Sequence, residues 1–158
     1  MINLSPDLQQ ILAVVPVQAN LVTSGQPTRE QLALIAAAGV EVVINLALTD
    51  ASNALHGEDR SVLSLGMDYV NLPLLFDQPS ARQIQRVLHL LHEWRDQKVW
   101  LHCALNYRVS SVVYLYRVLY LRMDQVDARA LLEQVWTPDA LWQAVIDELL
   151  HAVAPHTD

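Results

Sequence analysis

The chain has 158 residues, of which 53% are hydrophobic, and its formal net charge is −7. This length fits one domain over residues 1–158 with a sizeable core, and we expect the tail from about residue 154 to be disordered. One lysine and nine scattered arginines form no basic run, which argues against a nucleic-acid partner, and no apolar run approaches the ~18 residues of a membrane span.

The first elements predicted along the chain are a short helix and a short strand. Ser5 followed by Pro6 is typical of a helix start, so we expect a helix from there to about Ala13. The stretch "NLVTSG", residues 20–25, predicts a strand that ends in a turn at its glycine.

A clear helix and a buried strand are predicted next. Thr28 and Gln31 have the spacing of a capping box, and Gly39 is placed to end the helix that they begin. The run "VEVVINLAL", residues 40–48, is aliphatic and β-branched and too short for a helix of its own. We therefore interpret it as a strand covered on both faces.

The second half of the chain continues the alternation of helices and strands. A short helix would end at Gly66, a strand would cover 68–74, and Ser80 would cap a long helix that precedes a strand at 98–103. Three helices complete the chain, at about 108–122, 125–136 and 138–153, the last capped by Thr137 and Pro138.

Strands that alternate with helices indicate an α/β domain in which helices flank a short, mostly parallel central sheet. Ligands of such folds bind beyond the carboxyl ends of the strands. The segment "VWLHCALNYRVSS", residues 99–111, passes through that position, because it leads from the last strand into a helix. It holds the only cysteine of the chain, Cys103, and an arginine, Arg108, five positions later.

This pairing of residue types indicates a nucleophile beside an oxyanion site. The N-terminus of a helix offers unpaired backbone N–H groups and the positive end of the helix dipole, which favour an anion. A thiol placed there, near an arginine, ionises more easily than a free cysteine. The planar guanidinium of Arg108 suits the oxygens of phosphate or sulfate. A single cysteine also suits a reducing compartment, so we expect a cytoplasmic protein without an internal disulfide.

The arrangement of His102, Cys103 and Arg108 between a strand and a helix resembles the phosphate-binding loop of the cysteine-dependent tyrosine and dual-specificity phosphatases. The resemblance extends to three blocks: "SGQPTREQLALIAAAGVEVVINL", "GMDYVNLPLLFDQPS" and "VWLHCALNYRVSSVVYLYR". Together they look like the small bacterial phosphatase-like domain that is sometimes fused to a β-lactamase-like hydrolase.

The resemblance implies a hydrolase of phosphomonoesters that works through a cysteinyl-phosphate and needs no cofactor or metal. Cys103 would be the nucleophile, and Asp77, in "LLFDQPS", would be the general acid. His102 would orient the loop. The phosphoryl oxygens would be held by Arg108 and the backbone of the loop, formed by Ala104, Leu105, Asn106, Tyr107 and Arg108.

The loop departs from the phosphatase pattern in three ways. Four residues separate Cys103 from Arg108 where the family has five. Leu105 and Asn106 replace the usual small residue and glycine, although an asparagine can adopt a positive φ. Val109 stands where a hydroxyl residue normally assists the leaving thiolate, and Ser110 would take that supporting role only if the helix start shifted.

Two alternatives follow from these departures. A gap of four residues also resembles the loop of rhodanese-type sulfurtransferases, in which the cysteine, here Cys103, becomes a persulfide. The replaced residues would also fit a non-catalytic module that only binds anions. Under each reading the partner is a phosphorylated or other oxyanion compound, and the sequence leaves its identity and the oligomeric state open.

Overall fold

The computed structural model describes residues 1–152, so the tail predicted from about residue 154 lies outside the described residues. One five-stranded sheet organises this part of the chain, in the order β1-β2-β5-β3-β4. Only β1 is antiparallel to its neighbour. The strands are β1 (Val15–Gln18), β2 (Leu21–Ser24), β3 (Val42–Asn45), β4 (Asp68–Asn71) and β5 (Val99–His102).

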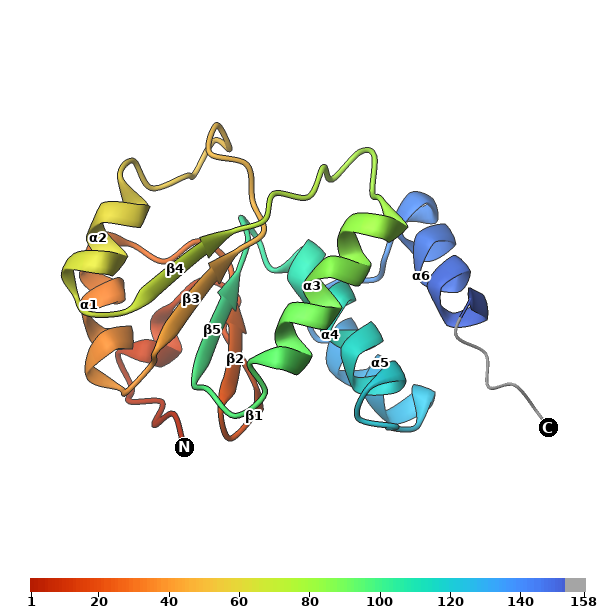
Figure 1. Ribbon diagram of the computed structural model, residues 1–158, viewed down its shortest axis with the longest axis horizontal. Helices are drawn as coiled ribbons and strands as arrows, with labels where there is room; N and C mark the ends of the chain where they lie inside the picture. Colours follow the sequence, from red (N-terminus) through yellow and green to blue (C-terminus); the bar gives the residue numbers. More distant parts are fainter. Residues whose placement is uncertain (153–158) are drawn as a thin grey trace.

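Helices cover both faces of the sheet, as Figure 1 shows. On one face lie the 3₁₀ turn η1 (Leu8–Gln10), α1 (Arg29–Ala37) and α2 (Glu58–Ser64). On the other lie α3 (Ala81–Glu93), α4 (Tyr107–Leu119), α5 (Gln125–Glu133) and α6 (Ala140–Ala152). The predicted α/β class, with a mostly parallel central sheet flanked by helices, is confirmed. None of the described helices is both long and apolar enough to cross a membrane.

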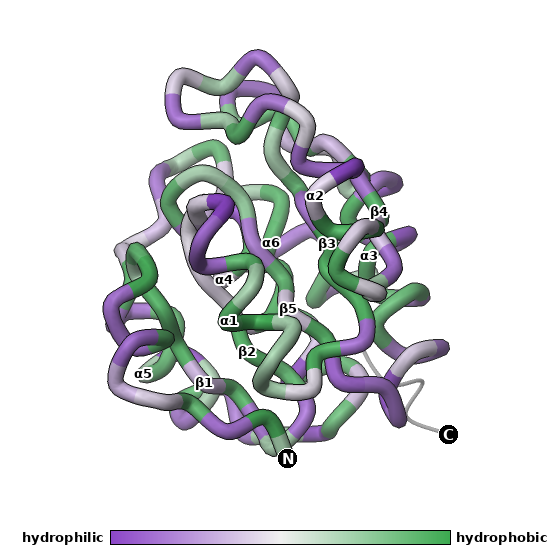
Figure 2. The backbone as a smooth tube through the Cα atoms, turned by 90° about the vertical axis from the view of Figure 1, so that its left-hand side faces the viewer, coloured by the Kyte–Doolittle hydropathy of each residue, from purple (hydrophilic) through white to green (hydrophobic). Residues whose placement is uncertain are grey.

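Alternating side chains of the central strands divide the core into two apolar layers. In β5, Val99 and Leu101 pack toward α3–α6, whereas Trp100 packs toward α1 and α2. In β3, Val42 and Ile44 likewise pack toward α3–α6. All four residues of each of these two strands are buried, which explains their almost continuous hydrophobic sequences. Figure 2 shows the hydrophobic stretch at β5 in green.

Several predicted caps are present. Thr28 and Gln31 form both hydrogen bonds of the capping box at α1, and Ser80 accepts from the Gln83 amide at α3. The cap predicted at the start of the last helix is wrong. The Asp139 carboxylate accepts from the Trp142 amide, so α6 begins at Ala140, beyond the predicted start.

The N-terminal region differs most from its prediction. The expected helix to Ala13 is only the 3₁₀ turn η1, although the Ser5 hydroxyl accepts a hydrogen bond from the Leu8 amide as a cap does. The sequence analysis did not predict β1, which contains Pro16. Proline lacks the N–H that a central strand needs, and β1 tolerates it because it is an edge strand.

Candidate active site

The carboxyl ends of the four parallel strands place one polar residue each in a row across the sheet. Ser24 pairs in register with His102, His102 with Asn45, and Asn45 with Asn71. Each is the last residue of its strand. The residue that follows His102 is Cys103, so the predicted nucleophile lies at this edge of the sheet, where ligands of such folds bind.

A pocket of about 150 Å³ brings the predicted thiol and guanidinium together. Cys103 is 1% exposed and packs in the apolar layer on the α3–α6 side. Arg108 is 7% exposed and lines the same pocket. The full lining consists of Phe76, Cys103, Ala104, Leu105, Tyr107 and Arg108. The shortened loop therefore still places cysteine and arginine on one cavity.

The backbone amides of residues 104–109 donate no hydrogen bond to protein acceptors among the described residues. The first to do so along α4 is the Ser110 amide, which donates to the Asn106 carbonyl. Six consecutive free donors at the start of a 13-residue helix provide the hydrogen-bonding capacity that an oxyanion requires.

Asn106 makes the tight turn that leads into α4. Its φ is +70°, in the left-handed region, which asparagine adopts more readily than other non-glycine residues. The side chain points inward and is fully buried. Its Nδ2 donates to the Ala13 carbonyl at 2.8 Å and to Thr23 Oγ1 at 3.2 Å. Asn106 is not among the residues that line the pocket, and its buried side chain anchors the loop to Ala13 and Thr23.

One hydrogen bond to the protein backbone holds the guanidinium of Arg108. Its Nη1 donates to the Leu74 carbonyl at 2.8 Å, in the segment after β4. No carboxylate among the described residues forms an ion pair with it. A nearly buried positive charge without a carboxylate partner favours an anionic ligand in the adjoining pocket.

Asp77, the predicted general acid, lies on the same segment and is exposed. It is not part of the pocket lining, whereas its neighbour Phe76 is. The Phe76 carbonyl accepts a hydrogen bond from Trp142 Nε1 at 2.8 Å, which ties the segment to α6. Asp77 is therefore the next residue in the chain after a residue of the pocket wall, but it is not itself part of that wall.

Aromatic side chains build that wall. Tyr107 stacks on Trp136 with ring centroids 4.7 Å apart and planes 2° from parallel, and Phe76 lies 5.6 Å from Trp136. The helix predicted at 125–136 is shorter, because α5 ends at Glu133. Trp136 lies beyond its end and packs against two residues of the pocket lining, Phe76 and Tyr107.

The hydroxyls of the two serines after Arg108 hydrogen-bond to the backbone of their own helix, α4. Ser110 and Ser111 both donate through Oγ to the Tyr107 carbonyl, at 3.0 and 2.9 Å. Val109 is fully buried. The helix starts at Tyr107, and neither serine contributes to the pocket lining.

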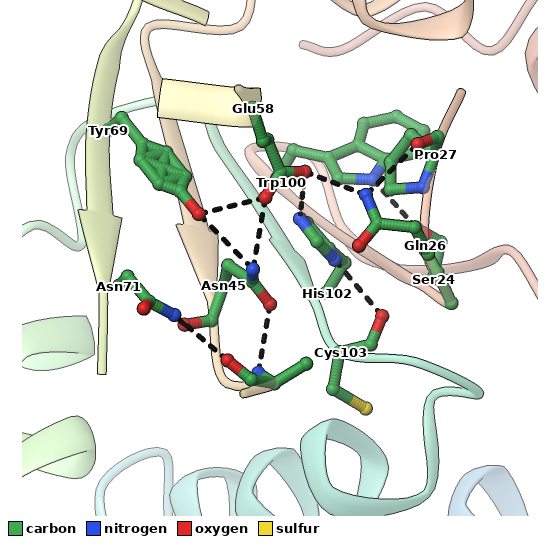
Figure 3. A network of polar contacts seen from close by, with 12 residues as sticks. Ser24, Gln26, Pro27, Asn45, Glu58, Tyr69, Asn71, Trp100, His102 and Cys103 are labelled. Carbon is green, nitrogen blue, oxygen red and sulfur yellow. Dashed lines mark hydrogen bonds and ion pairs between the residues drawn. The ribbon is translucent and has the colours of Figure 1, made fainter. Parts of the chain in front are cut away.

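Behind the loop, His102 is completely buried and connects Cys103 to a glutamate (Figure 3). Its Nδ1 lies 3.0 Å from the Cys103 carbonyl oxygen, and its Nε2 lies 2.8 Å from Glu58 Oε1. The second contact has the distance of an ion pair, but it is not aligned as a hydrogen bond.

Glu58 is 5% exposed and accepts further hydrogen bonds from Gln26 Nε2, Asn45 Nδ2 and the Tyr69 hydroxyl. Burial by itself would raise the pKa of Glu58, but His102, followed by Gln26 and Tyr69, holds that pKa below its ordinary value. Burial and the charge of Glu58 raise the pKa of Tyr69, so its hydroxyl keeps the proton that it donates.

The sequence analysis missed Glu58, Phe76 and Trp136. Phe76 is the only phenylalanine and precedes Asp77, which could have drawn attention to it. Glu58 lies more than forty residues before Cys103, in the short helix predicted to end at Gly66, and only the fold brings it to the site.

The fold and the position of the cysteine loop define a phosphatase-like domain of the dual-specificity and tyrosine type. Residues 12–142 match the family described as DSP-PTPase phosphatase fused to NAD+ kinase, and the chain belongs to this family. The family resemblance predicted from the sequence is confirmed. The fusion to a β-lactamase-like hydrolase stays a prediction.

Solved structures agree with this assignment. A candidate phosphatase (DUF442) from Shewanella putrefaciens CN-32 is 28% identical, with a TM-score of 0.84 over 94% of this chain and 98% of that one. Tk-PTP in its active form is 16% identical, with a TM-score of 0.75 over 88% and 97%. TpbA of P. aeruginosa, solved in complex with phosphotyrosine, is 18% identical, with a TM-score of 0.69 over 90% and 91%. None of the curated proteins compared with the sequence matches it.

Proposed function

We propose that the chain is a cytoplasmic, cysteine-dependent hydrolase of phosphomonoesters. One observation carries the proposal: Cys103 and Arg108 line a single pocket at the carboxyl edge of the sheet, beside a run of unpaired amides. A thiol, a guanidinium and free N–H donors on one cavity form a nucleophile with an oxyanion cradle. Membership of a phosphatase family supports the same chemistry.

The reaction would proceed in two displacements at phosphorus. The Cys103 thiolate attacks, an S–P bond forms, and the bond from phosphorus to the ester oxygen breaks. Asp77 gives its proton to the departing oxygen. Water then attacks the cysteinyl-phosphate, Asp77 takes its proton, and the S–P bond breaks to restore the thiolate. Arg108 and the amides of the loop stabilise the phosphoryl oxygens throughout.

The pocket and the solved relatives support a phosphorylated substrate. TpbA was crystallised with phosphotyrosine and PTPMT1 with the phosphoinositide PI(5)P, both phosphomonoesters. In this chain, Phe76, Leu105 and Tyr107 place apolar and aromatic surface around the anion site. Phe76 and Leu105 are 38% and 47% exposed, so they can contact the organic part of a substrate.

The direct test is hydrolysis of p-nitrophenyl phosphate, with and without a chelator, by the wild type and Cys103→Ser. We expect turnover that survives the chelator and is abolished by the substitution, because a serine hydroxyl is a far poorer nucleophile than a thiolate. Ser64→Ala, which changes an exposed residue at the end of α2, is the control and should be fully active. Activity retained in Cys103→Ser would exclude the proposed nucleophile.

The same samples address the two alternatives. The matching family and the solved relatives are phosphatases, so the comparisons do not favour sulfur transfer. Mass spectrometry after thiosulfate treatment would reveal it as one added sulfur on Cys103. A module that only binds anions would gain thermal stability from phosphate, lose that gain in Arg108→Ala, and hydrolyse nothing.

A further inference from the structure

The polar cluster behind the cysteine loop centres on Glu58, the first residue of α2. Three neutral donors hold its carboxylate: Gln26 Nε2 at 2.8 Å, Asn45 Nδ2 at 3.0 Å and the Tyr69 hydroxyl at 2.8 Å. They come from three separate segments of the chain. A carboxylate that is 5% exposed and held in this way has a fixed position.

The fourth contact of Glu58 is to His102. Both ring nitrogens of His102 face oxygen atoms: Nε2 faces Glu58 Oε1 at 2.8 Å, and Nδ1 faces the Cys103 carbonyl at 3.0 Å. The ring is completely buried, so the carboxylate on one side and the carbonyl on the other fix its orientation.

The contact at Nδ1 fixes the peptide that follows the nucleophile. In a trans peptide the carbonyl and the next N–H point in opposite directions. When His102 holds the Cys103 carbonyl, the Ala104 N–H is therefore directed away from His102. That amide is the first of the unpaired donors of the loop, and Ala104 lines the pocket. Figure 3 shows the cysteine sulfur pointing away from His102 and Glu58 as well.

We propose that Glu58 is a positioning residue for the phosphate-binding loop: it holds the His102 ring in its orientation, and His102 directs the Ala104 amide toward the oxyanion. Its link to turnover rests on the proposed function, whereas its effects on His102 and on anion binding do not. Glu58 itself never touches the substrate, because it lies on the α2 side of the sheet and Cys103 packs on the other.

Solvent reaches this cluster through a second cavity. Glu58 lines a cavity of about 220 Å³ together with His56, Asp59 and Tyr69. These three residues and His102 are the titratable groups around it on the elements packed against it. Protons can therefore reach Glu58 without passing through the substrate pocket.

Two substitutions of Glu58 separate its effect on the orientation of His102 from its effect on the packing of the cluster. In Glu58→Gln the amide oxygen can still accept from Asn45 and Tyr69, while the amide nitrogen takes the place of Oε1 beside His102 and no longer accepts from Gln26. The side chain keeps its size and its place against the imidazole but loses the negative charge. Glu58→Ala loses all of these bonds. Tyr69→Phe is the matched control, because it removes one hydrogen bond to Glu58 and none to His102.

The measurements are the phosphate dissociation constant from calorimetry and the backbone ¹H–¹⁵N signal of Ala104. We expect Glu58→Ala to bind phosphate about 2- to 10-fold more weakly, the worth of one oriented hydrogen bond, with Glu58→Gln and Tyr69→Phe close to the wild type. The Ala104 signal should move in Glu58→Ala and stay near its wild-type position in Glu58→Gln and Tyr69→Phe.

Either of two results overturns the proposal: unchanged phosphate affinity in folded Glu58→Ala, or an Ala104 signal that is the same in Glu58→Ala as in the wild type. If Glu58→Ala does not fold, Glu58→Asp replaces it, because the shorter side chain should lose the contact with His102 and weaken phosphate binding in the same way. A wild type that binds phosphate but hydrolyses no ester contradicts the proposed function alone, because neither measurement depends on turnover.

Discussion

Asn106 does at the residue scale what a glycine does in the related phosphatase loops. Its φ of +70° is costly for most side chains, but its amide group offsets this cost with two buried hydrogen bonds, to Ala13 and Thr23. The loop therefore keeps its turn without glycine. It also gains an anchor to β2 and to the segment that precedes β1.

Two substitutions of Asn106 should separate the contribution of its side-chain hydrogen bonds from that of its backbone conformation. We expect Asn106→Ala to lower the free energy of unfolding by about 2–4 kcal/mol, since it loses the hydrogen bonds and keeps an unfavourable φ. Asn106→Gly should lose less, because glycine adopts this φ freely. Urea unfolding of both variants provides the test, and equal losses would mean that the backbone conformation contributes nothing.

Asp77 is exposed beside the pocket wall, and its proposed role depends on the leaving group. Asp77→Asn should lower kcat for phenyl phosphate by about 100-fold or more, because a poor leaving group needs a proton. The loss should be smaller for p-nitrophenyl phosphate, whose leaving group departs as the anion. Gln78→Ala is a neighbouring control. Equal losses on both substrates would assign the general acid elsewhere.

At the scale of elements, the end of β2 and the cysteine loop approach each other closely at Gly25. A Cβ at this position would lie 2.7 Å from the Ala104 carbonyl oxygen and 2.9 Å from Leu12 Cδ2. That carbonyl also accepts hydrogen bonds from the Gln26 amide and Asn53 Nδ2, both at 3.0 Å. A side chain at residue 25 would thus displace the loop that forms the pocket.

Gly25→Ala should therefore impair the pocket more than the fold. We expect weaker phosphate binding and at least a roughly tenfold lower kcat/KM, because displacements near 1 Å can cost about 100-fold in rate. Thr28→Ala is the stability control, since it removes the α1 cap, at a cost of about 1 kcal/mol, and leaves the loop untouched. Gly25→Ala with wild-type kinetics would show that the loop tolerates the shift.

At the scale of the whole molecule, the Glu58 cluster joins α2, β3, β4 and β5 and makes stability depend on pH. The pKa of Glu58 is lowered in the folded protein, so the unfolded chain binds its proton more readily. The stabilisation is present above the ordinary value of 4.5 and is lost as the pH falls through the lower, folded value.

Denaturation of the wild type and Glu58→Gln at about pH 7 and about pH 3.5 tests this linkage. The wild type should be the more stable at neutral pH, and the difference should shrink at the acidic pH, because glutamine takes up no proton. A difference that is the same at both pH values would show that Glu58 does not titrate between them.

Much of this protein was predictable because its signals are local. Aliphatic runs predicted β3 and β5, Thr28 and Ser80 marked the starts of α1 and α3, and the spacing of Cys103 and Arg108 identified the loop. Each of these features depends on neighbouring residues in the chain. The mistakes came where local signals were weak: β1, an edge strand with proline, and the beginning of α6, where Asp139 caps instead of Thr137.

Sequence by itself thus determined the α/β class, the family and the position of the cysteine loop. Only the tertiary structure decided what surrounds that loop: Glu58 behind His102, Trp136 against Tyr107, and the Leu74 carbonyl on Arg108. The physical reason is distance along the chain. The partners in each pair are separated by about 30 to 45 residues. The contacts of His102 and Arg108 form because a parallel sheet gathers the ends of its strands at one edge, and the contact of Trp136 with Tyr107 forms because α4 and α5 pack together.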